Sequence, residues 1–436
     1  MRDDFLSITL SEWQTLGPET SPALTNRFLD SSLATRRTVE RLQEGQLLEL
    51  SELRRGLRVT TRSHVGRVKL GPLEITVLPK IRGLPLLNLV RYAFGFRRLN
   101  LISQTDHDVD QLGLEDLLVH QLNAEAQELF SRGLRRSYVS TTERLSSPRG
   151  RIDLNRLALD GGTITATLTC QHHPRVEDTL LNQTLLAGLK LASSVSSVVE
   201  LRRDSLRLAS LLEEQVSQRR LDAALLDRAE RMMNRLTGAY ASAISIIRLL
   251  ADAQGIVLDG TNTSAPLPGF LFDMNSFFQA LISRFLRENL SGYTVRDEHG
   301  LRGMMRYNLN FHRPKWRSPT PRPDYVVMQR GAVCSILDAK YRDLWEKPLP
   351  REMLYQLVVY AISQRQRPQS SILYPTMNDQ AREVRIDISD PLLGKPLGQV
   401  CLRPVLLQRI ESLIEGKTSE SFHERVEYAH QLAFGV

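Results

Sequence analysis

The sequence has few cysteines and no long apolar run, and both scarcities limit the classes of protein that fit it. The three cysteines are scattered and form no CxxC pair; they are Cys170, Cys334 and Cys401. A disulfide framework and a structural zinc site are therefore not expected. The N-terminus, Met-Arg-Asp-Asp-Phe, has no apolar signal core, and no run reaches the roughly 18 apolar residues of a membrane span. These absences predict a cytoplasmic protein without membrane contacts.

A phosphate-binding loop is also missing. Gly416-Lys417-Thr418 matches the end of such a loop, but the glycine that is required five residues earlier is replaced by Glu411. The tripeptide also follows a predicted helix rather than a strand, so Gly416 fits the role of a helix C-cap. The chain is therefore not expected to hydrolyse nucleotides itself.

What is present is the composition of an ordinary globular protein with a basic balance. The chain has 436 residues, 42% hydrophobic and 24% charged, which allows two or three domains with separate cores. The formal net charge is +8 at pH 7, and arginine carries most of the excess. This balance favours a polyanionic partner, although a basic surface without a binding role also fits it.

The hydrophobic period changes along the chain. Residues Leu57–Ile81 alternate as in a small β-rich unit, whereas residues 177–253 carry apolar residues at helical spacing. Residues 259–269, rich in Gly, Pro, Ser and Thr, form the best linker. An amphipathic helix at Met274–Leu290 and then further strands and helices follow, which predicts an α/β architecture. We therefore predict a β-rich N-terminal domain at residues 1–165, a helical segment at 166–260 and an α/β domain at 261–436.

The most informative stretch is a predicted β-hairpin whose two strands flank an Arg330-Gly331 turn. If the turn centres on the glycine, Asp324 before the first strand lies opposite Asp338 at the end of the second. Asp338 and Lys340 are two residues apart, so they point to the same face of a strand. Two carboxylates and an ammonium then meet at one end of the hairpin, which suits phosphodiester cleavage assisted by a hard divalent cation. For Asp-Ala-Lys alone, an ordinary strand end is the simpler interpretation.

A predicted helix after the hairpin adds two polar residues to this set. The helix spans Pro350–Ser363 and begins with a proline, which the first helical position tolerates. Gln356 and Tyr360 are four residues apart within it and therefore share one face. The pair therefore presents an amide and a phenol on one side of the helix that follows the hairpin.

The order Pro323-Asp324, Asp338-Ala339-Lys340 and Gln356-x-x-x-Tyr360 resembles the PD-(D/E)xK nuclease superfamily in its RecB-like form. More narrowly, stretches spread between residues 71 and 341 resemble the McrC family, the nuclease subunits of modification-dependent restriction systems. Each stretch is weak alone, and their joint order makes the resemblance specific. The stretches are Gly71–Ile81, Arg149–Ile152, Cys170 with Glu177–Asn182, Asp273–Asn275 and Leu337–Tyr341. The resemblance implies a C-terminal domain with a central mixed sheet flanked by helices.

The resemblance also implies the roles of the hairpin residues. Asp324 and Asp338 would be metal ligands, and the backbone carbonyl of Ala339 would add a third oxygen. The cation would be Mg²⁺ or Mn²⁺, since both prefer oxygen ligands. Lys340 would be the catalytic lysine.

Two helices complete the implied site. Gln356 and Tyr360 would support it or contact the DNA backbone. Members of the family commonly have a glutamate in the first nuclease helix, where this chain has Gln279. An amide can coordinate only through its carbonyl oxygen, so one firmly bound metal is expected rather than two.

McrC-like proteins also imply a partner. They join a hexameric AAA+ GTPase of McrB type, which selects double-stranded DNA by its modified cytosine, and they stimulate its GTP hydrolysis. By this resemblance, residues 1–260 would contact the motor and residues 261–436 would form the DNA endonuclease. Two alternatives stay open, namely a RecB-like nuclease that works without a motor and a non-cleaving adaptor that activates an AAA+ motor.

Overall fold

The computed structural model describes residues 5–96, 112–159, 166–255, 269–308, 310, 317–364, 368–416 and 418–435. Its contacts group the chain into two units. Unit 1 comprises Met1–Phe96, Asp108–Leu114 and Leu271–Val436, and unit 2 comprises Arg97–His107 and Glu115–Phe270. The linker predicted at 259–269 lies outside the described residues except at its last glycine, and both predicted domain boundaries fall next to or inside undescribed stretches. The three-domain division therefore stays a prediction.

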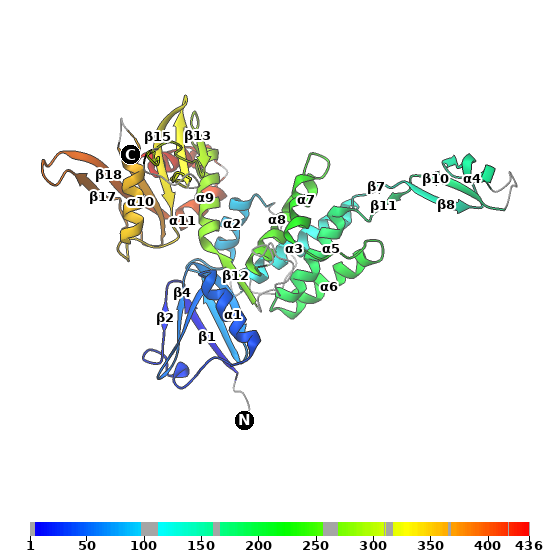
Figure 1. Ribbon diagram of the computed structural model, residues 1–436, viewed down its shortest axis with the longest axis horizontal. Coiled ribbons are helices and arrows are strands. Elements are labelled where there is room, and N and C mark those ends of the chain that lie inside the picture. Colours follow the sequence, from blue (N-terminus) through cyan, green and yellow to red (C-terminus); the bar gives the residue numbers. More distant parts are fainter. Residues whose placement is uncertain are drawn as a thin grey trace. The chain divides into compact units, whose positions relative to one another are not determined.

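The N-terminal part of unit 1 folds into two small sheets, drawn mostly in blue in Figure 1. Their strands are β1 (Leu6–Ser11), β2 (Thr15–Leu16), β3 (Leu48–Leu53), β4 (Gly56–Thr61), β5 (His64–Leu70), β6 (Leu73–Leu78) and β12 (Gly269–Asp273). One sheet has the order β1-β6-β5-β12 and the other β2-β4-β3. Side chains of β6 alternate between buried and half-buried, the period-two pattern that predicted a strand there. Helices α1 (Leu33–Glu44) and α2 (Gly83–Phe94) belong to the same part.

The C-terminal part of unit 1 contains a six-stranded sheet of order β13-β14-β15-β16-β18-β17. The strands are β13 (Thr294–Asp297), β14 (Tyr325–Gln329), β15 (Ala332–Ala339), β16 (Gln369–Thr376), β17 (Val384–Ser389) and β18 (Pro396–Leu406). Strands β15, β16 and β18 run parallel, and the other neighbouring pairs are antiparallel. The predicted α/β class with a mixed sheet is therefore confirmed.

Helices cover both faces of this sheet. They are α9 (Met274–Asn289), α10 (Arg351–Ile362), α11 (Leu407–Glu415) and α12 (Ser419–Phe434). Helix α10 packs Leu357 and Tyr360 into a buried core with Val326 of β14. Tyr325 precedes Val326 in the strand and so points to the opposite face, where its hydroxyl donates to the backbone carbonyl of Gln279 in α9 at 2.8 Å. Strand β15 thus runs between two layers of helices, and Asp338 lies near its C-terminal end, with Lys340 just beyond it.

Unit 2 combines helices with a thin β-rich arm at residues 137–176. The helices are α3 (Leu114–Arg132), α5 (Leu180–Val195), α6 (Val199–Glu213), α7 (Ala223–Arg231) and α8 (Ala241–Ala253), which confirms the helical pattern expected over 177–253. The arm contains β7 (Ser137–Tyr138), β8 (Thr141–Leu145), β9 (Arg151–Ile152), α4 (Leu154–Leu159), β10 (Leu168–His172) and β11 (Arg175–Val176). Gly150 has φ 71°, and a Cβ there would stand 2.3 Å from the Gln171 carbonyl oxygen. Glycine is needed at this position because two strands of the arm approach each other closely.

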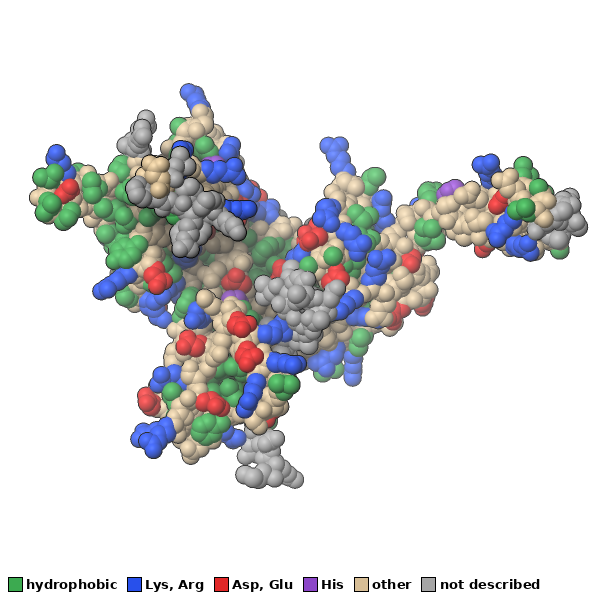
Figure 2. All heavy atoms as spheres, viewed as in Figure 1, with side chains coloured by type: hydrophobic (Ala, Val, Ile, Leu, Met, Phe, Trp, Pro, Cys, Tyr) green, Lys and Arg blue, Asp and Glu red, His purple; other side chains and the backbone are tan. Residues whose placement is uncertain are grey.

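The surface and helices add two observations. On the face seen in Figure 2, Lys and Arg side chains are spread over both units and interspersed with Asp and Glu. The net charge of +8 therefore does not by itself single out one binding surface on that face. None of the helices in the described ranges combines the length and the apolar character needed to cross a membrane.

Candidate active site

The hairpin β14–β15 brings Asp324 and Asp338 to one end as the sequence predicts, although its strands reach that register through a β-bulge. Both turn residues, Arg330 (φ 50°) and Gly331 (φ 84°), are in the left-handed region, as a two-residue type I′ turn requires. The turn pairs Gln329 with Ala332, and a β-bulge between Val327 and Met328 then shifts the pairing by one residue, so that Tyr325 pairs with Leu337 and Asp324 and Asp338 come next along the two strands. The two carboxylates therefore belong to one end of the hairpin.

Lys340 joins the two carboxylates into one cluster. Its ammonium lies 2.9 Å from Asp338 Oδ2 and 3.5 Å from Asp324 Oδ2. The backbone N–H of Ala339 donates to the same Asp324 oxygen at 2.7 Å, which fixes that side chain. Asp338 is only 2% exposed. The structure thus brings together the three charged residues that the sequence singled out.

The charges in this cluster are strongly coupled. Burial, helped by the charge of Asp324, raises the pKa of Asp338 from 3.8 to about 6 against the opposing effect of Lys340. Burial alone would lower the pKa of Lys340, but the two neighbouring carboxylates outweigh it and raise that pKa. The lysine therefore keeps its proton, and among the described residues its ammonium is the cation paired with both carboxylates.

The donor atoms fit a hard cation. Asp338 Oδ1 is buried and accepts no hydrogen bond from the described part of the chain. Carboxylate oxygens are the ligands that Mg²⁺ prefers in proteins. Within the described ranges no group of three or more His, Cys, Asp or Glu side chains could hold a metal. Further ligands at this site would therefore have to be the Ala339 carbonyl, Gln279 or water.

Gln356 and Tyr360 form a hydrogen-bonded pair on α10. The Gln356 amide donates to the Tyr360 hydroxyl at 2.6 Å, and that hydroxyl donates to the Arg322 carbonyl oxygen at 2.9 Å. Burial is the main cause that raises the pKa of Tyr360, and the charges of Asp338 and Asp324 add to it. Tyr360 thus holds the backbone two residues before Asp324. Its hydroxyl is also near enough to both carboxylates for their charges to raise its pKa.

Gln279 lines the same cavity as the first carboxylate of the cluster. It lines a cavity of about 670 Å³ together with Asp324, Asp297 and Arg287. The position at which this chain departs from the expected glutamate therefore shares a cavity with one carboxylate of the cluster. A carboxylate there would add a charged ligand to the same cavity.

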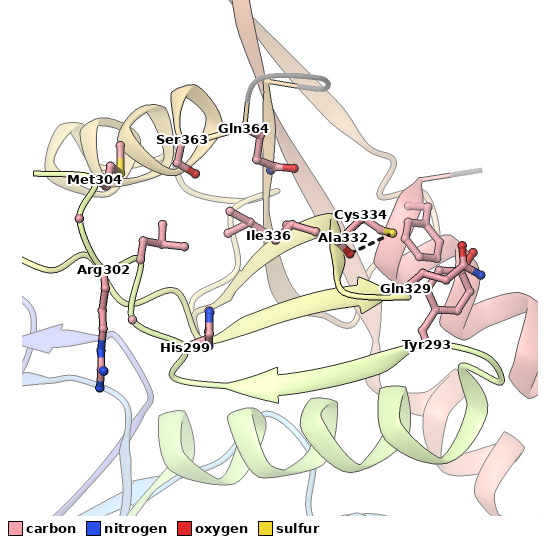
Figure 3. Close-up of a pocket in the computed structure, with 15 residues that line it drawn as sticks. Tyr293, His299, Arg302, Met304, Gln329, Ala332, Cys334, Ile336, Ser363 and Gln364 are labelled. Carbon is pink, nitrogen blue, oxygen red and sulfur yellow. Dashed lines mark hydrogen bonds between the residues drawn. The ribbon is translucent and has the colours of Figure 1, made fainter.

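A second cavity, of about 1250 Å³, lies elsewhere along the same sheet. Figure 3 shows His299 and Arg302 on the segment after β13, and Ser363 and Gln364 at the end of α10, around it. None of the residues predicted to act in the site lines this larger cavity. The larger cavity is therefore not the place where the predicted active-site residues lie.

Sequence reasoning missed a turn that follows β1. The hydroxyl of Tyr341 donates to Glu12 Oε1 at 3.0 Å, and the indole N–H of Trp13 donates to the Tyr341 carbonyl oxygen at 3.0 Å. Tyr341 directly follows Lys340, so this turn touches the flank of the cluster. Trp13 and Tyr341 are 328 positions apart, and no local spacing could have linked them.

Glu12→Gln is expected to remove a pH-dependent loss of stability. Burial raises the pKa of Glu12 from 4.5 to about 7, against hydrogen bonds from the Lys80 N–H and the Tyr341 hydroxyl that lower it. Because the folded pKa exceeds the unfolded one, the free energy of unfolding falls as pH rises from 4.5 to about 7. Glutamine does not titrate, so it should be more stable than the wild type by about 3 kcal/mol at about pH 8.

Urea unfolding at about pH 5 and about pH 8 measures this difference. Glu49→Gln is the matched control, because the Glu49 side chain is 54% exposed on β3. Equal pH dependence in the wild type and Glu12→Gln would contradict the prediction.

The fold and the cluster define an α/β protein with a carboxylate–lysine site at the end of a hairpin, and comparison with known proteins identifies its family. The model for the family described as McrBC 5-methylcytosine restriction system component matches residues 59–375, which is more than half of the chain. The chain therefore belongs to the McrBC family. No curated protein matches it in sequence.

Solved structures extend the comparison to the fold. The chain is similar to one in a refined half-complex from a tetradecameric assembly of Thermococcus gammatolerans McrB AAA+ hexamers with bound McrC. That match has a TM-score of 0.64 and 17% identity, and covers 97% of this chain and 100% of that chain. A chain of the Thermococcus gammatolerans McrBC complex matches with a TM-score of 0.46 and 18% identity, covering 67% of this chain and 90% of that one. At such low identity the first match supports a shared fold alone.

Proposed function

We propose that this chain is the metal-dependent endodeoxyribonuclease subunit of an McrBC-like restriction complex, with a site of the PD-(D/E)xK type. The observation that carries the proposal is the convergence of Asp324, Asp338 and Lys340 at one end of the hairpin. The buried Asp338 oxygen without a hydrogen-bond partner among the described residues supports cation binding at the same place.

The chemistry follows from the properties of these side chains. Asp324, Asp338 and the Ala339 carbonyl would hold one Mg²⁺ or Mn²⁺. When bound, the cation supplies Lewis-acid stabilisation of the charge that develops on the scissile phosphate. Lys340 keeps its proton beside the carboxylates, where its ammonium offsets negative charge and helps orient the attacking water.

The pair on α10 would divide two tasks. Tyr360 is buried and bonded to the Arg322 carbonyl, so it supports the segment that carries Asp324. Gln356 is exposed and is held in place through the Tyr360 hydroxyl. We therefore assign contact with the DNA backbone to Gln356 rather than to Tyr360.

The proposed partner is a hexameric AAA+ GTPase of McrB type. A chain of similar fold stands in an assembly of McrB AAA+ hexamers with bound McrC, which supports this choice. The family description names 5-methylcytosine, which supports double-stranded DNA with modified cytosine as the substrate. We assign the motor contacts to residues 1–260 and place the complex in the cytoplasm.

Reconstitution tests the proposal directly. The purified chain is incubated with a purified AAA+ GTPase of McrB type, GTP, Mg²⁺ and either 5-methylcytosine DNA or unmodified DNA. Cleavage is expected only when chain, motor, GTP, Mg²⁺ and methylated DNA are all present. Cleavage by the chain without the motor would favour a standalone nuclease. Stimulated GTP hydrolysis without cleavage under any condition would favour a non-cleaving adaptor.

Gln279→Glu is expected to lower the Mg²⁺ concentration needed for half-maximal cleavage. The new carboxylate would enter the cavity that Gln279 shares with Asp324. A gain of about 1.4 kcal/mol in cation binding corresponds to a roughly tenfold lower requirement. Magnesium titrations of the wild type, Gln279→Glu and Gln279→Ala measure it, and alanine should shift the requirement upward. Identical titrations for all three would show that this side chain lies outside the metal site.

A further inference from the structure

The segment that follows Lys340 is held by the N-terminal part of unit 1. It comprises Tyr341–Lys347, and the contacts come from the turn after β1. The Trp13 indole N–H donates to the Tyr341 carbonyl oxygen at 3.0 Å, and the Lys347 ammonium donates to the Trp13 carbonyl oxygen at 3.0 Å. The Arg342 guanidinium lies over the indole ring, 5.5 Å from its centre. Trp13 therefore contacts both ends of the segment.

Glu12 adds a buried polar contact beside Trp13. Its Oε1 atom accepts from the Tyr341 hydroxyl at 3.0 Å and from the Lys80 backbone N–H at 3.1 Å. The Lys80 ammonium in turn lies 3.7 Å from Asp343. Glu12, Tyr341 and Asp343 are all buried, so water cannot replace these partners when a contact breaks.

The turn is locked into an unusual backbone conformation. Trp13 has φ 57°, a left-handed value that bulky residues rarely adopt. The Gln14 N–H donates to Thr61 Oγ1 at 2.9 Å, and the Thr61 hydroxyl donates to the Ser11 carbonyl oxygen at 2.7 Å. Strained residues persist where their surroundings over-determine them, and they cluster at functional sites.

We infer that Glu12 and Trp13 are positioning residues of the nuclease site, which fix the segment after Lys340 so that its ammonium stays between the two carboxylates. The inference rests on the proposed nuclease function. On the side of the sheet, the Lys340 N–H donates to the Leu373 carbonyl oxygen at 3.0 Å. Strand β16 thus holds the backbone of Lys340 itself, and the turn after β1 holds the residues that follow it. Misplacing a reacting group by about 1 Å can cost roughly a hundredfold in rate.

Trp13→Phe tests the inference, because phenylalanine keeps an aromatic ring over Arg342 but removes the N–H donor to Tyr341. We expect kcat for cleavage by the complex to fall roughly 10- to 100-fold, with KM for DNA and stimulation of GTP hydrolysis unchanged. Trp345→Phe makes the same chemical change within the segment, at a residue that is 40% exposed, and should keep wild-type rates. A variant that was merely less stable would lose cleavage and GTPase stimulation together.

A labelling measurement gives an answer that does not depend on cleavage. An amine-acetylating reagent followed by mass spectrometry reports the accessibility of Lys340, with exposed Lys395 in the same protein as the reference. Lys340 is expected to react several-fold faster in Trp13→Phe than in the wild type or Trp345→Phe. Tyr341→Phe, which removes only the hydroxyl bonded to Glu12, should shift the rate in the same direction by a smaller factor, and it serves if Trp13→Phe does not fold.

The outcomes separate the two ideas. Unchanged Lys340 labelling in both Trp13→Phe and Tyr341→Phe would overturn the positioning role whether or not the complex cuts DNA. Faster labelling together with the expected fall in kcat supports it. If labelling rises while the wild-type complex cuts no DNA, the positioning of Lys340 stands and the nuclease proposal fails.

Discussion

Asp338→Asn is expected to abolish DNA cleavage and, at the same time, to make the protein more stable. Asparagine keeps the shape but removes the charge proposed to hold the cation, so cleavage should fall by at least roughly a thousandfold. The same charge is buried, and burial together with Asp324 raises the pKa of Asp338 from 3.8 to about 6. The folded pKa exceeds the unfolded one, so the wild type loses stability as pH rises through that window and the variant does not. Without divalent cations at about pH 8, the variant should gain about 3 kcal/mol.

Cleavage by the complex and urea unfolding at about pH 5 and about pH 8 measure the two effects. Asp387→Asn makes the same chemical change at an exposed position on β17 and should alter neither. Mg²⁺ should stabilise the wild type against unfolding by mass action, and should not stabilise Asp338→Asn. Loss of cleavage together with lower stability at about pH 8 would instead make Asp338 a structural residue whose charge the fold requires.

The cluster could be predicted from the sequence because its geometry follows from local patterns. The Arg330-Gly331 turn joins two short strands that bring Asp324 and Asp338 together, but their register also depends on a β-bulge between Val327 and Met328, which the sequence pattern did not predict. Helical spacing likewise puts Gln356 and Tyr360 on one face, where they hydrogen-bond. Their roles in catalysis stay predictions.

Contacts between distant segments could not be predicted in this way. An apolar pattern predicts a helix from Val405, but β18 continues to Leu406 because it pairs with β16 as far as Thr376. Pairing with a neighbouring strand overrides the local preference there. Strand β12, which begins at the end of the predicted linker, joins the N-terminal sheet next to β5 for the same reason. Neither neighbour is visible in a window of sequence.

Several stretches on which the family resemblance depends meet at one junction of unit 1. Asn275, which opens α9, accepts from the Tyr341 N–H at 3.2 Å and donates to Ser63 Oγ at 2.6 Å. Lys80, at the end of the β6 stretch, donates its backbone N–H to Glu12 beside the same tyrosine. Motifs that look independent along the chain are therefore parts of one polar junction. This junction borders the end of the strand that carries Asp338 and is followed by Lys340.

Lys340→Met is expected to abolish cleavage as well, but with the opposite effect on stability. Removing the ammonium should lower the cleavage rate roughly 10²- to 10⁴-fold. It also leaves Asp324 and Asp338 facing each other without their shared partner, which raises the pKa of Asp338 further. At about pH 8, above the wild-type Asp338 pKa of about 6, the loss should be roughly 2 kcal/mol, the size of a hydrogen bond to a charged group. It should shrink below the wild-type Asp338 pKa of about 6, because that carboxyl is then protonated.

The double variant, Asp338→Asn with Lys340→Met, shows whether the two effects share one cause. Once Asp338 is neutral, removing the lysine leaves no buried carboxylate unpaired at that position, so it should cost clearly less than in the wild type. Urea unfolding of the wild type, both single variants and the double variant at about pH 8 measures the coupling. Lys395→Met, at an exposed turn position, is the control for loss of a lysine charge. If the two changes simply add, Lys340 and Asp338 do not compensate each other in the folded protein, and the proposed site loses its electrostatic basis.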